Sequence, residues 1–265
     1  FYRWPLSVNK TCNMDGIIAS GNTDSATPQV LGLPAVEYVL YQDAPLDSCS
    51  SSPAAASDAA DRCEFAQAAI TKMTTALDTL ESNLENYAPS SNPGGQRAAQ
   101  DIFDAVFYVY NETKGEKLQK TLLPQTANDS FKPENLEIPF ADINAEVIAA
   151  NLKGTQSMMT AADKGFAAYL EAAGERDLAD DMLSALQTAI TAAEGFDSSF
   201  RDILTAATSD DVDDCINATA ETTGSDVAEL CALDSKIKLF TDDLKGQMAL
   251  NLGLTVPQDA ESDGD

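Results

Sequence analysis

The amino-acid sequence predicts an all-α protein. Apolar residues recur at steps of three and four along several long segments, which is the spacing of one helix face. Alanine-rich tracts such as 66–80 and 177–193 favour helix, whereas alternating runs of Val, Ile and Thr between turns are scarce. With 265 residues, of which 44% are hydrophobic, the chain can form either one large domain or two small ones.

Three segments carry regular apolar stripes and predict long bundle helices. The first stripe consists of Phe65, Ala69, Met73, Ala76, Leu80, Leu84 and Tyr87, the second of Met182, Leu186, Ala189, Ala193, Phe196, Phe200 and Ile203, and the third of Leu230, Leu233, Ile237, Phe240, Leu244 and Met248.

Two further segments predict a central helix and a shorter one. Residues 96–112 are apolar on more than one face, which favours a central position; the residues concerned are Ile102, Phe103, Ala105, Val106, Phe107, Val109 and Tyr110. In the other segment the apolar face is expected to consist of Ile143, Val147, Ala150, Gly154 and Met158, with Gly154 at a close helix contact.

Proline and glycine clusters divide the chain. The run Pro-Ser-Ser-Asn-Pro-Gly-Gly at 89–95 is the best boundary, because it combines several turn-forming residues. We therefore expect one domain at 1–90, a second at 91–256 and an acidic tail at 257–265. The carboxylates of that tail resemble the opening of a calcium loop, but the sequence ends before a closing ligand, so we expect a disordered tail.

The composition excludes several classes of function. Asp and Glu number 43 against 16 Lys and Arg, giving a formal charge of −27 that repels phosphate backbones, so we expect no nucleic-acid partner. The absence of histidine excludes histidine-dependent metal sites and Ser-His-Asp or Cys-His catalysis. No segment approaches the roughly 18 apolar residues of a membrane-spanning helix. A hydrolase that uses carboxylates alone remains an alternative, although no particular pair stands out.

The five cysteines indicate an oxidising compartment. Cys49 and Cys63, and likewise Cys215 and Cys231, enclose short turn-rich segments, so we predict two local disulfides. Cys12 is left over. A thiolate metal site is disfavoured because no pair has the C-x-x-C spacing.

The segment Gly-Leu-Pro-Ala-Val-Glu-Tyr-Val-Leu-Tyr at 32–41 carries an unusual carboxylate. Pro34 suits the first turn of a helix, and Glu37 then lies one turn later in otherwise apolar surroundings. Such a carboxylate must be solvated, hydrogen-bonded or bound to a ligand. The alternative role is to offset the positive end of the helix dipole.

This segment resembles the signature of the imelysin-like family, whose best-known members carry G-x-H-x-x-E there. Further blocks resemble the family in the same order: FYRWPLSVNKTCNMD, RCEFAQAA, IFDAVFYVYNETKGEKL, VIAANLKGTQSMM and DDLKGQMALNLGLTVP. The resemblance implies two helical-bundle domains, the first incomplete in this chain, in a periplasmic or surface-anchored bacterial protein. It also implies a ligand site between the domains, linked to iron acquisition.

The sequence departs from the family where peptidase-type members have the signature histidine, because Pro34 stands there. One carboxylate is a poor zinc site, so we expect no peptidase activity. The resemblance places Gly32, Pro34 and Glu37 at the ligand site; Trp4 and Asp15 flank them in sequence, and Tyr108, Lys114 and Asn151 are candidates for the opposite wall.

Each of these side chains has an ordinary structural role as its alternative. Trp4 would be a core residue, Tyr108 a packing aromatic and Lys114 a solvated cation at a helix C-terminus, whereas Asn151 on an apolar helix needs polar partners.

The function expected from the sequence is binding, without catalysis, of a small ligand associated with iron, with no resident cofactor beyond such iron. A protein partner in an uptake system would fit this role, and contact with a membrane would require an N-terminal lipid anchor that these residues do not include. The alternatives are the carboxylate hydrolase and a surface scaffold that binds proteins through exposed helix faces.

Overall fold

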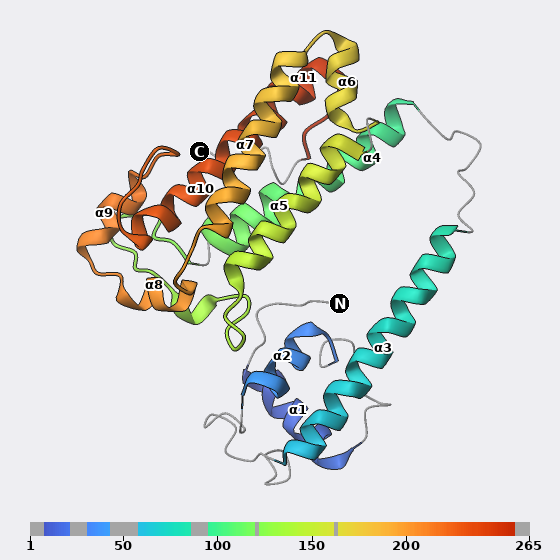
Figure 1. Cartoon of the computed structure of the whole chain (residues 1–265), viewed down its shortest axis with the longest axis vertical. Coiled ribbons are helices and arrows are strands. Elements are labelled where there is room, and N and C mark those ends of the chain that lie inside the picture. The colour runs from blue at the N-terminus through green and yellow to red at the C-terminus, as the bar shows by residue number, and fades with distance from the viewer. Residues whose placement is uncertain are drawn as a thin grey trace. The chain divides into compact units, whose positions relative to one another are not determined.

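The computed structural model describes residues 8–21, 31–42, 58–85, 95–119, 122–161 and 164–257. All regular structure within these residues is helical, which confirms the all-α prediction (Figure 1). Trp4, Cys49 and residues 258–265 of the expected tail lie outside the described residues, as does the side chain of Cys12. In the described part of the chain, no helix is both long enough and apolar enough to cross a membrane.

The chain divides into two compact units. Unit 1 consists of residues 1–90 together with Glu137–Asp142, and unit 2 consists of Ser91–Leu136 and residues 143–265. The sequence placed Glu137–Asp142 within the 91–256 domain, whereas the contacts of this short segment assign it to unit 1.

Unit 1 contains the helices α1 (Val8–Ser20), α2 (Leu33–Tyr41) and α3 (Ala59–Glu85). Its core is small; the buried apolar residues are Met14, Ile18, Leu31, Ala35, Tyr38, Val39, Phe65, Ala66 and Ala69. Within the described residues, the first predicted stripe is therefore buried only at its beginning; the side chain of Leu84 and the whole of Tyr87 lie outside the described part of the chain. Ala76 and Leu80 of that stripe are exposed, and so are Ile70 and Leu77 beside it.

Unit 2 opens with α4 (Gln96–Val106), the π-helix η3 (Val109–Gln119) and the 3₁₀ turn η4 (Pro133–Asn135). It continues with α5 (Asn144–Thr160), α6 (Phe166–Ala173), α7 (Arg176–Glu194), α8 (Phe200–Ala206), α9 (Asp210–Ile216) and α10 (Asp226–Asp243). A second π-helix, η6 (Leu244–Met248), and α11 (Ala249–Leu252) follow directly after α10. The predicted helix at 96–112 is thus split: its first part forms α4, and its last residues begin the π-helix η3.

Several ends of these helices have local causes. The hydroxyl oxygens of Ser199 and Ser225 accept hydrogen bonds from the backbone N–H groups three residues later, at 3.1 and 3.2 Å, and so cap α8 and α10. Gly174 ends α6 with φ of 91°, a conformation in which a side chain would be strained.

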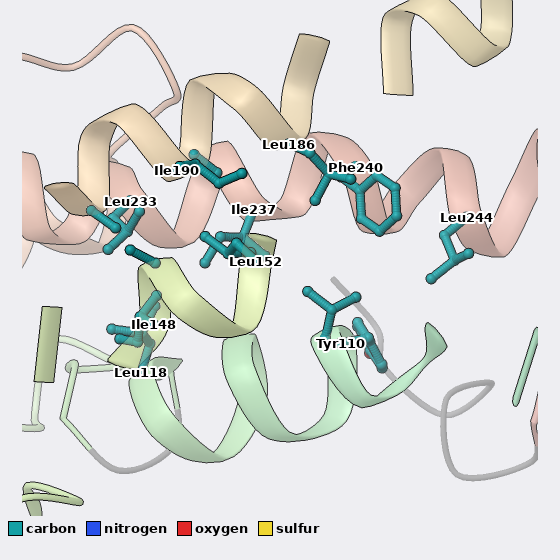
Figure 2. Packing of buried hydrophobic residues seen from close by; sticks show 14 of the residues in the cluster. Tyr110, Leu118, Ile148, Leu152, Leu186, Ile190, Leu233, Ile237, Phe240 and Leu244 are labelled. Atoms are coloured by element: carbon teal, nitrogen blue, oxygen red, sulfur yellow. The ribbon is translucent and has the colours of Figure 1, made fainter. Parts of the chain in front are cut away.

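The core of unit 2 lies between α5, α7, α10 and η3. Side chains from α5, α7 and α10 meet there, among them Leu152, Ile190 and Ile237 (Figure 2). All six residues of the third predicted stripe are fully buried. The second stripe is also buried apart from Phe196, which is half-buried. It does not form one helix, because α7 ends at Glu194 and the last two residues of the stripe, Phe200 and Ile203, belong to α8.

The apolar face predicted for α5 was displaced by about one residue. The buried face consists of Asn144, Ile148, Ala149, Leu152, Thr155 and Met159. Ile143 instead precedes the helix and is exposed, and Gly154 has open space around it and makes no close helix contact. The predicted stripe lies beside the buried one because one residue turns a helix by about 100°.

Candidate functional site

The signature segment forms α2 as the sequence indicated. Gly32 is the N-cap, Pro34 occupies the first turn, and Glu37 follows on the buried side of the helix. Pro34 is well placed because its missing N–H has no partner to lose at this position. Glu37 retains only 8% exposure, so its carboxylate requires partners.

Those partners are backbone groups far along the sequence. The Oε1 atom of Glu37 accepts hydrogen bonds from the N–H groups of Phe140 and Ala141, at 2.7 and 2.9 Å. The Phe140 ring packs edge-on against Tyr38, with 5.4 Å between ring centroids. Glu37 therefore fastens the segment Glu137–Asp142 to α2 within unit 1.

Tyr38 connects the other polar groups of unit 1. Its hydroxyl donates to Asp15 Oδ1 at 2.9 Å, and both residues are completely buried. Arg62 lies with its guanidinium carbon 5.1 Å from the centroid of the Tyr38 ring and donates to the carbonyl oxygens of Tyr38, Val39 and Gln42. Because these carbonyls end α2, a buried cation here satisfies them and offsets the negative end of the helix dipole.

Sequence reasoning missed Arg62. It lies in the block RCEFAQAA, where only the resemblance drew attention to it. The one local signal is a basic residue on the apolar side of the first turn of α3, three residues before the buried Phe65.

The residues present do not fit a resident metal ion. Among the described residues, no group of three or more cysteine or acidic side chains is close enough to hold one. Glu37 is committed to two N–H groups through Oε1, and Pro34 has no side-chain lone pair.

In unit 2, Lys114 is buried rather than solvated, with an exposed fraction of 1%. Its Nζ donates to Gln119 Oε1 at 3.2 Å and lies 4.0 Å from Asp234 Oδ2. Nζ also lies 5.7 Å from the centroid of the Tyr110 ring, and the Nζ of Lys245 lies 4.3 Å from the same centroid. The π-helices η3 and η6 thus each direct one lysine to a single buried tyrosine, and π-turns of this kind are frequent at functional sites.

The other two candidates of unit 2 differ in burial. Tyr108 is 51% exposed and has the Nζ of Lys117 5.8 Å from its ring centroid. Asn151 is half-buried, and its Nδ2 is shielded from solvent without a hydrogen-bond acceptor among the described residues. The hydroxyl of Thr113, next to Lys114, is likewise shielded from solvent and has no hydrogen-bond partner among the described residues. Buried donors without partners are rare, which makes Asn151 and Thr113 notable.

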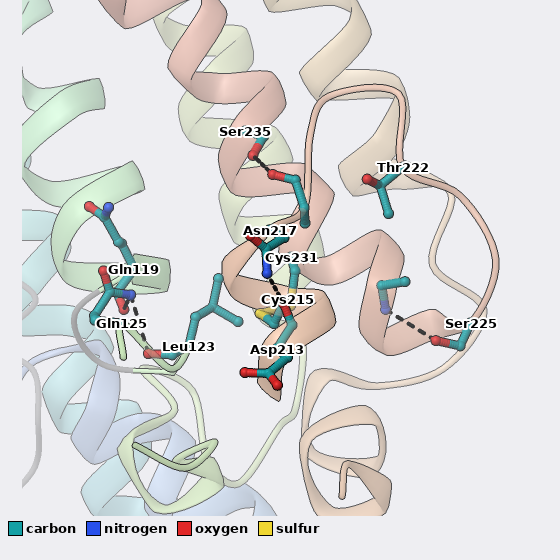
Figure 3. The surroundings of a disulfide bond; sticks show 12 residues. Gln119, Leu123, Gln125, Asp213, Cys215, Asn217, Thr222, Ser225, Cys231 and Ser235 are labelled. Atoms are coloured by element: carbon teal, nitrogen blue, oxygen red, sulfur yellow. Dashed lines mark hydrogen bonds between the residues drawn. A yellow bond between two sulfur atoms is a disulfide. The ribbon is translucent and has the colours of Figure 1, made fainter. Parts of the chain in front are cut away.

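The predicted disulfide between Cys215 and Cys231 is present and joins α9 to α10 (Figure 3). Both cysteines line a small cavity of about 110 Å³ together with Gln119 and Asp234, which are partners of Lys114. The prediction for Cys63 was wrong, because this residue is a free thiol on the exposed side of α3. Its expected partner, Cys49, lies outside the described residues.

Comparison with known proteins identifies one related family. The family model described as Imelysin matches residues 4–225, which include both α2 and the Lys114 region. No curated protein and no solved structure shows significant similarity to the chain.

Proposed function

We propose that this chain, which belongs to the imelysin family, is a ligand-binding protein of the periplasm or cell surface that does not cleave peptides. The observation that carries the proposal is the engagement of Glu37. This carboxylate is the surviving member of the signature pair, and its Oε1 holds two backbone N–H groups.

Metal-assisted peptide hydrolysis needs a ligand set with an open position and a base that can take a proton from bound water. Pro34 cannot supply a ligand. The Oε1 atom of Glu37 is also already occupied by two backbone N–H groups. Both features support binding over catalysis.

The ligand we propose is small and iron-associated, as the family resemblance suggests. Glu37 and Gly32 of unit 1 are assigned on the family resemblance alone, and the residues of each unit are tested separately. Lys114 and Asn151 are the contacts we assign in unit 2. The shielded Nδ2 of Asn151 supports this choice, because an oxygen atom of a ligand would satisfy it. The Cys215–Cys231 disulfide supports an oxidising compartment.

Calorimetric titration tests this proposal. The protein would be titrated separately with ferric iron, ferrous iron, haem, zinc and calcium, and each titration repeated with Glu37→Gln and Lys114→Met. The matched controls are Glu64→Gln and Lys153→Met, which change exposed residues of the same two types. We expect stoichiometric binding of an iron species that both site variants weaken and neither control affects, with circular dichroism showing that all variants remain folded.

Two results would overturn the proposal. Cleavage of a peptide substrate by the wild-type protein, lost in Glu37→Gln, would establish the hydrolase alternative. Failure of every probe to bind would favour the protein-binding scaffold, for which the exposed Ile70, Leu77 and Leu80 of α3 provide an apolar face.

A further inference from the structure

Unit 2 contains a groove that is separate from the residues around Lys114. It encloses about 630 Å³ and lies between the exposed side of α7, the connection that precedes α10, and α10 itself. This volume falls within the range of about 300–1,000 Å³ that is typical of ligand pockets.

One wall of the groove is a row of uncharged polar side chains on α7. Ser184, Gln187, Thr188 and Thr191 are spaced by three and four residues, so they share one helix face. They lie opposite the buried apolar stripe of the same helix and are exposed to solvent. We call this row together with the facing Thr222 and Thr223 the hydroxyl groove.

The polar row is held in place by hydrogen bonds. Gln156 of α5 donates to Gln187 Oε1 at 3.2 Å, and Gln187 Nε2 donates to Thr191 Oγ1 at 3.3 Å. The Thr191 hydroxyl in turn donates to the backbone carbonyl of Gln187 at 2.8 Å. These contacts fix the orientation of the Gln187 amide, which lowers the entropy that a ligand would have to remove.

The groove also has an apolar part. Ala192, Gly195 and Phe196 line it at the C-terminal end of α7. The Phe196 ring is held edge-on against Phe200, with 5.2 Å between ring centroids. A rigid aromatic ring beside a row of hydroxyl and amide groups suits a ligand that has both C–H faces and many hydroxyls.

The charge of the groove selects against ionic ligands. Its lining includes one acid, Glu229, and one base, Lys236, so its formal charge is zero in a protein whose net charge is −27. A charged ligand would give up a large free energy of hydration on entering the groove, and the uncharged polar lining would compensate for little of it. A neutral ligand gives up much less. A helical peptide would require apolar anchor pockets, which a wall of hydroxyls does not offer.

From this combination we propose that the hydroxyl groove binds a segment of a neutral oligosaccharide. The proposal is independent of the iron-associated ligand, because none of the residues assigned to that ligand lines the groove.

The test is titration calorimetry of the whole chain with chitohexaose, cellohexaose and maltoheptaose. Thr191→Val and Gln187→Leu remove groove hydrogen bonds from exposed positions and so preserve the fold. The matched control is Thr71→Val on α3, whose hydroxyl donates to the carbonyl four residues earlier at 2.8 Å, as that of Thr191 does. We expect at least one of these glycans to bind, with Kd raised about tenfold in each groove variant and unchanged in the control.

Three outcomes would overturn the proposal. In the first, none of the three glycans binds. In the second, a glycan binds, but the groove variants leave its Kd unchanged. In the third, a neutral Ser/Gln-rich peptide binds saturably, and only the groove variants abolish this binding. The last would assign the groove to a peptide.

Discussion

Replacing Glu37 by alanine should release the segment Glu137–Asp142 from unit 1. The side chain accepts two hydrogen bonds through one oxygen, from N–H groups at 2.7 and 2.9 Å. Hydrogen bonds to an ionised group contribute about 1.5–3 kcal/mol each, and bonds that share an acceptor are not additive, so we expect a loss of about 3 kcal/mol. Glu37→Gln keeps an acceptor oxygen but loses the charge, and we expect a loss of about 1 kcal/mol.

Hydrogen exchange measures this effect where it arises. The amides of Phe140 and Ala141 should exchange about a hundredfold faster in Glu37→Ala, because about 3 kcal/mol of local protection corresponds to roughly two powers of ten. The exposed Glu64 provides the control, since Glu64→Ala removes a carboxylate from the same unit without a buried partner. Unchanged protection of both amides in a folded Glu37→Ala protein would refute the structural role given to this carboxylate.

Four other predictions address separate contacts. Replacing both Cys215 and Cys231 by alanine should lower the free energy of unfolding by about 3 kcal/mol, because the disulfide closes a loop whose ends are 16 residues apart. Thermal denaturation measures this loss, and an unchanged Tm would show that α9 is held by packing alone. Burial and two neighbouring aspartates raise the pKa of Asp243, so its ionised form is unfavourable in the folded protein. Asp243→Asn should therefore raise Tm at neutral pH, by only about 1 °C because the group is partly exposed to solvent. This gain should disappear below the ordinary pKa of 3.8, where both side chains are neutral, and a difference that stays constant across pH would contradict this cause. Arg62→Met should cost about 2–4 kcal/mol by chemical denaturation because three carbonyls lose their donor, and a loss under 0.5 kcal/mol would mean that water replaces it. Lys114→Met should cost about 1–3 kcal/mol in the same assay, and a gain in stability would show that burying the charge is unfavourable in itself.

The sequence predicted the helices best where apolar spacing was regular and each helix was packed on one side. The stripe from Leu230 to Met248 is buried along its whole length because α10 and η6 form one continuous face against the core. On α5 the same reasoning chose the wrong face. Its apolar and small residues cover two adjoining faces, and only the neighbouring α7 and η3 decide which of them is buried.

The candidate site was predicted in part. Sequence reasoning found Glu37 as a carboxylate in apolar surroundings, but its partners Phe140 and Ala141 are backbone groups about a hundred residues away. A backbone N–H has no residue-specific signal, so no pattern could have identified these donors. The burial of Lys114 was missed for a related reason, since its partner Asp234 lies on α10, far along the chain.

The sequence by itself determined the helical class, the acidic surface, the absence of histidine chemistry and the short disulfide at Cys215, because each depends on composition or on spacing along a few turns. Tertiary structure decided the role of the polar residues. Glu37, Arg62 and Lys114 are charges that would be solvated on an isolated helix. They are buried here because distant segments supply the hydrogen bonds that compensate for the loss of water.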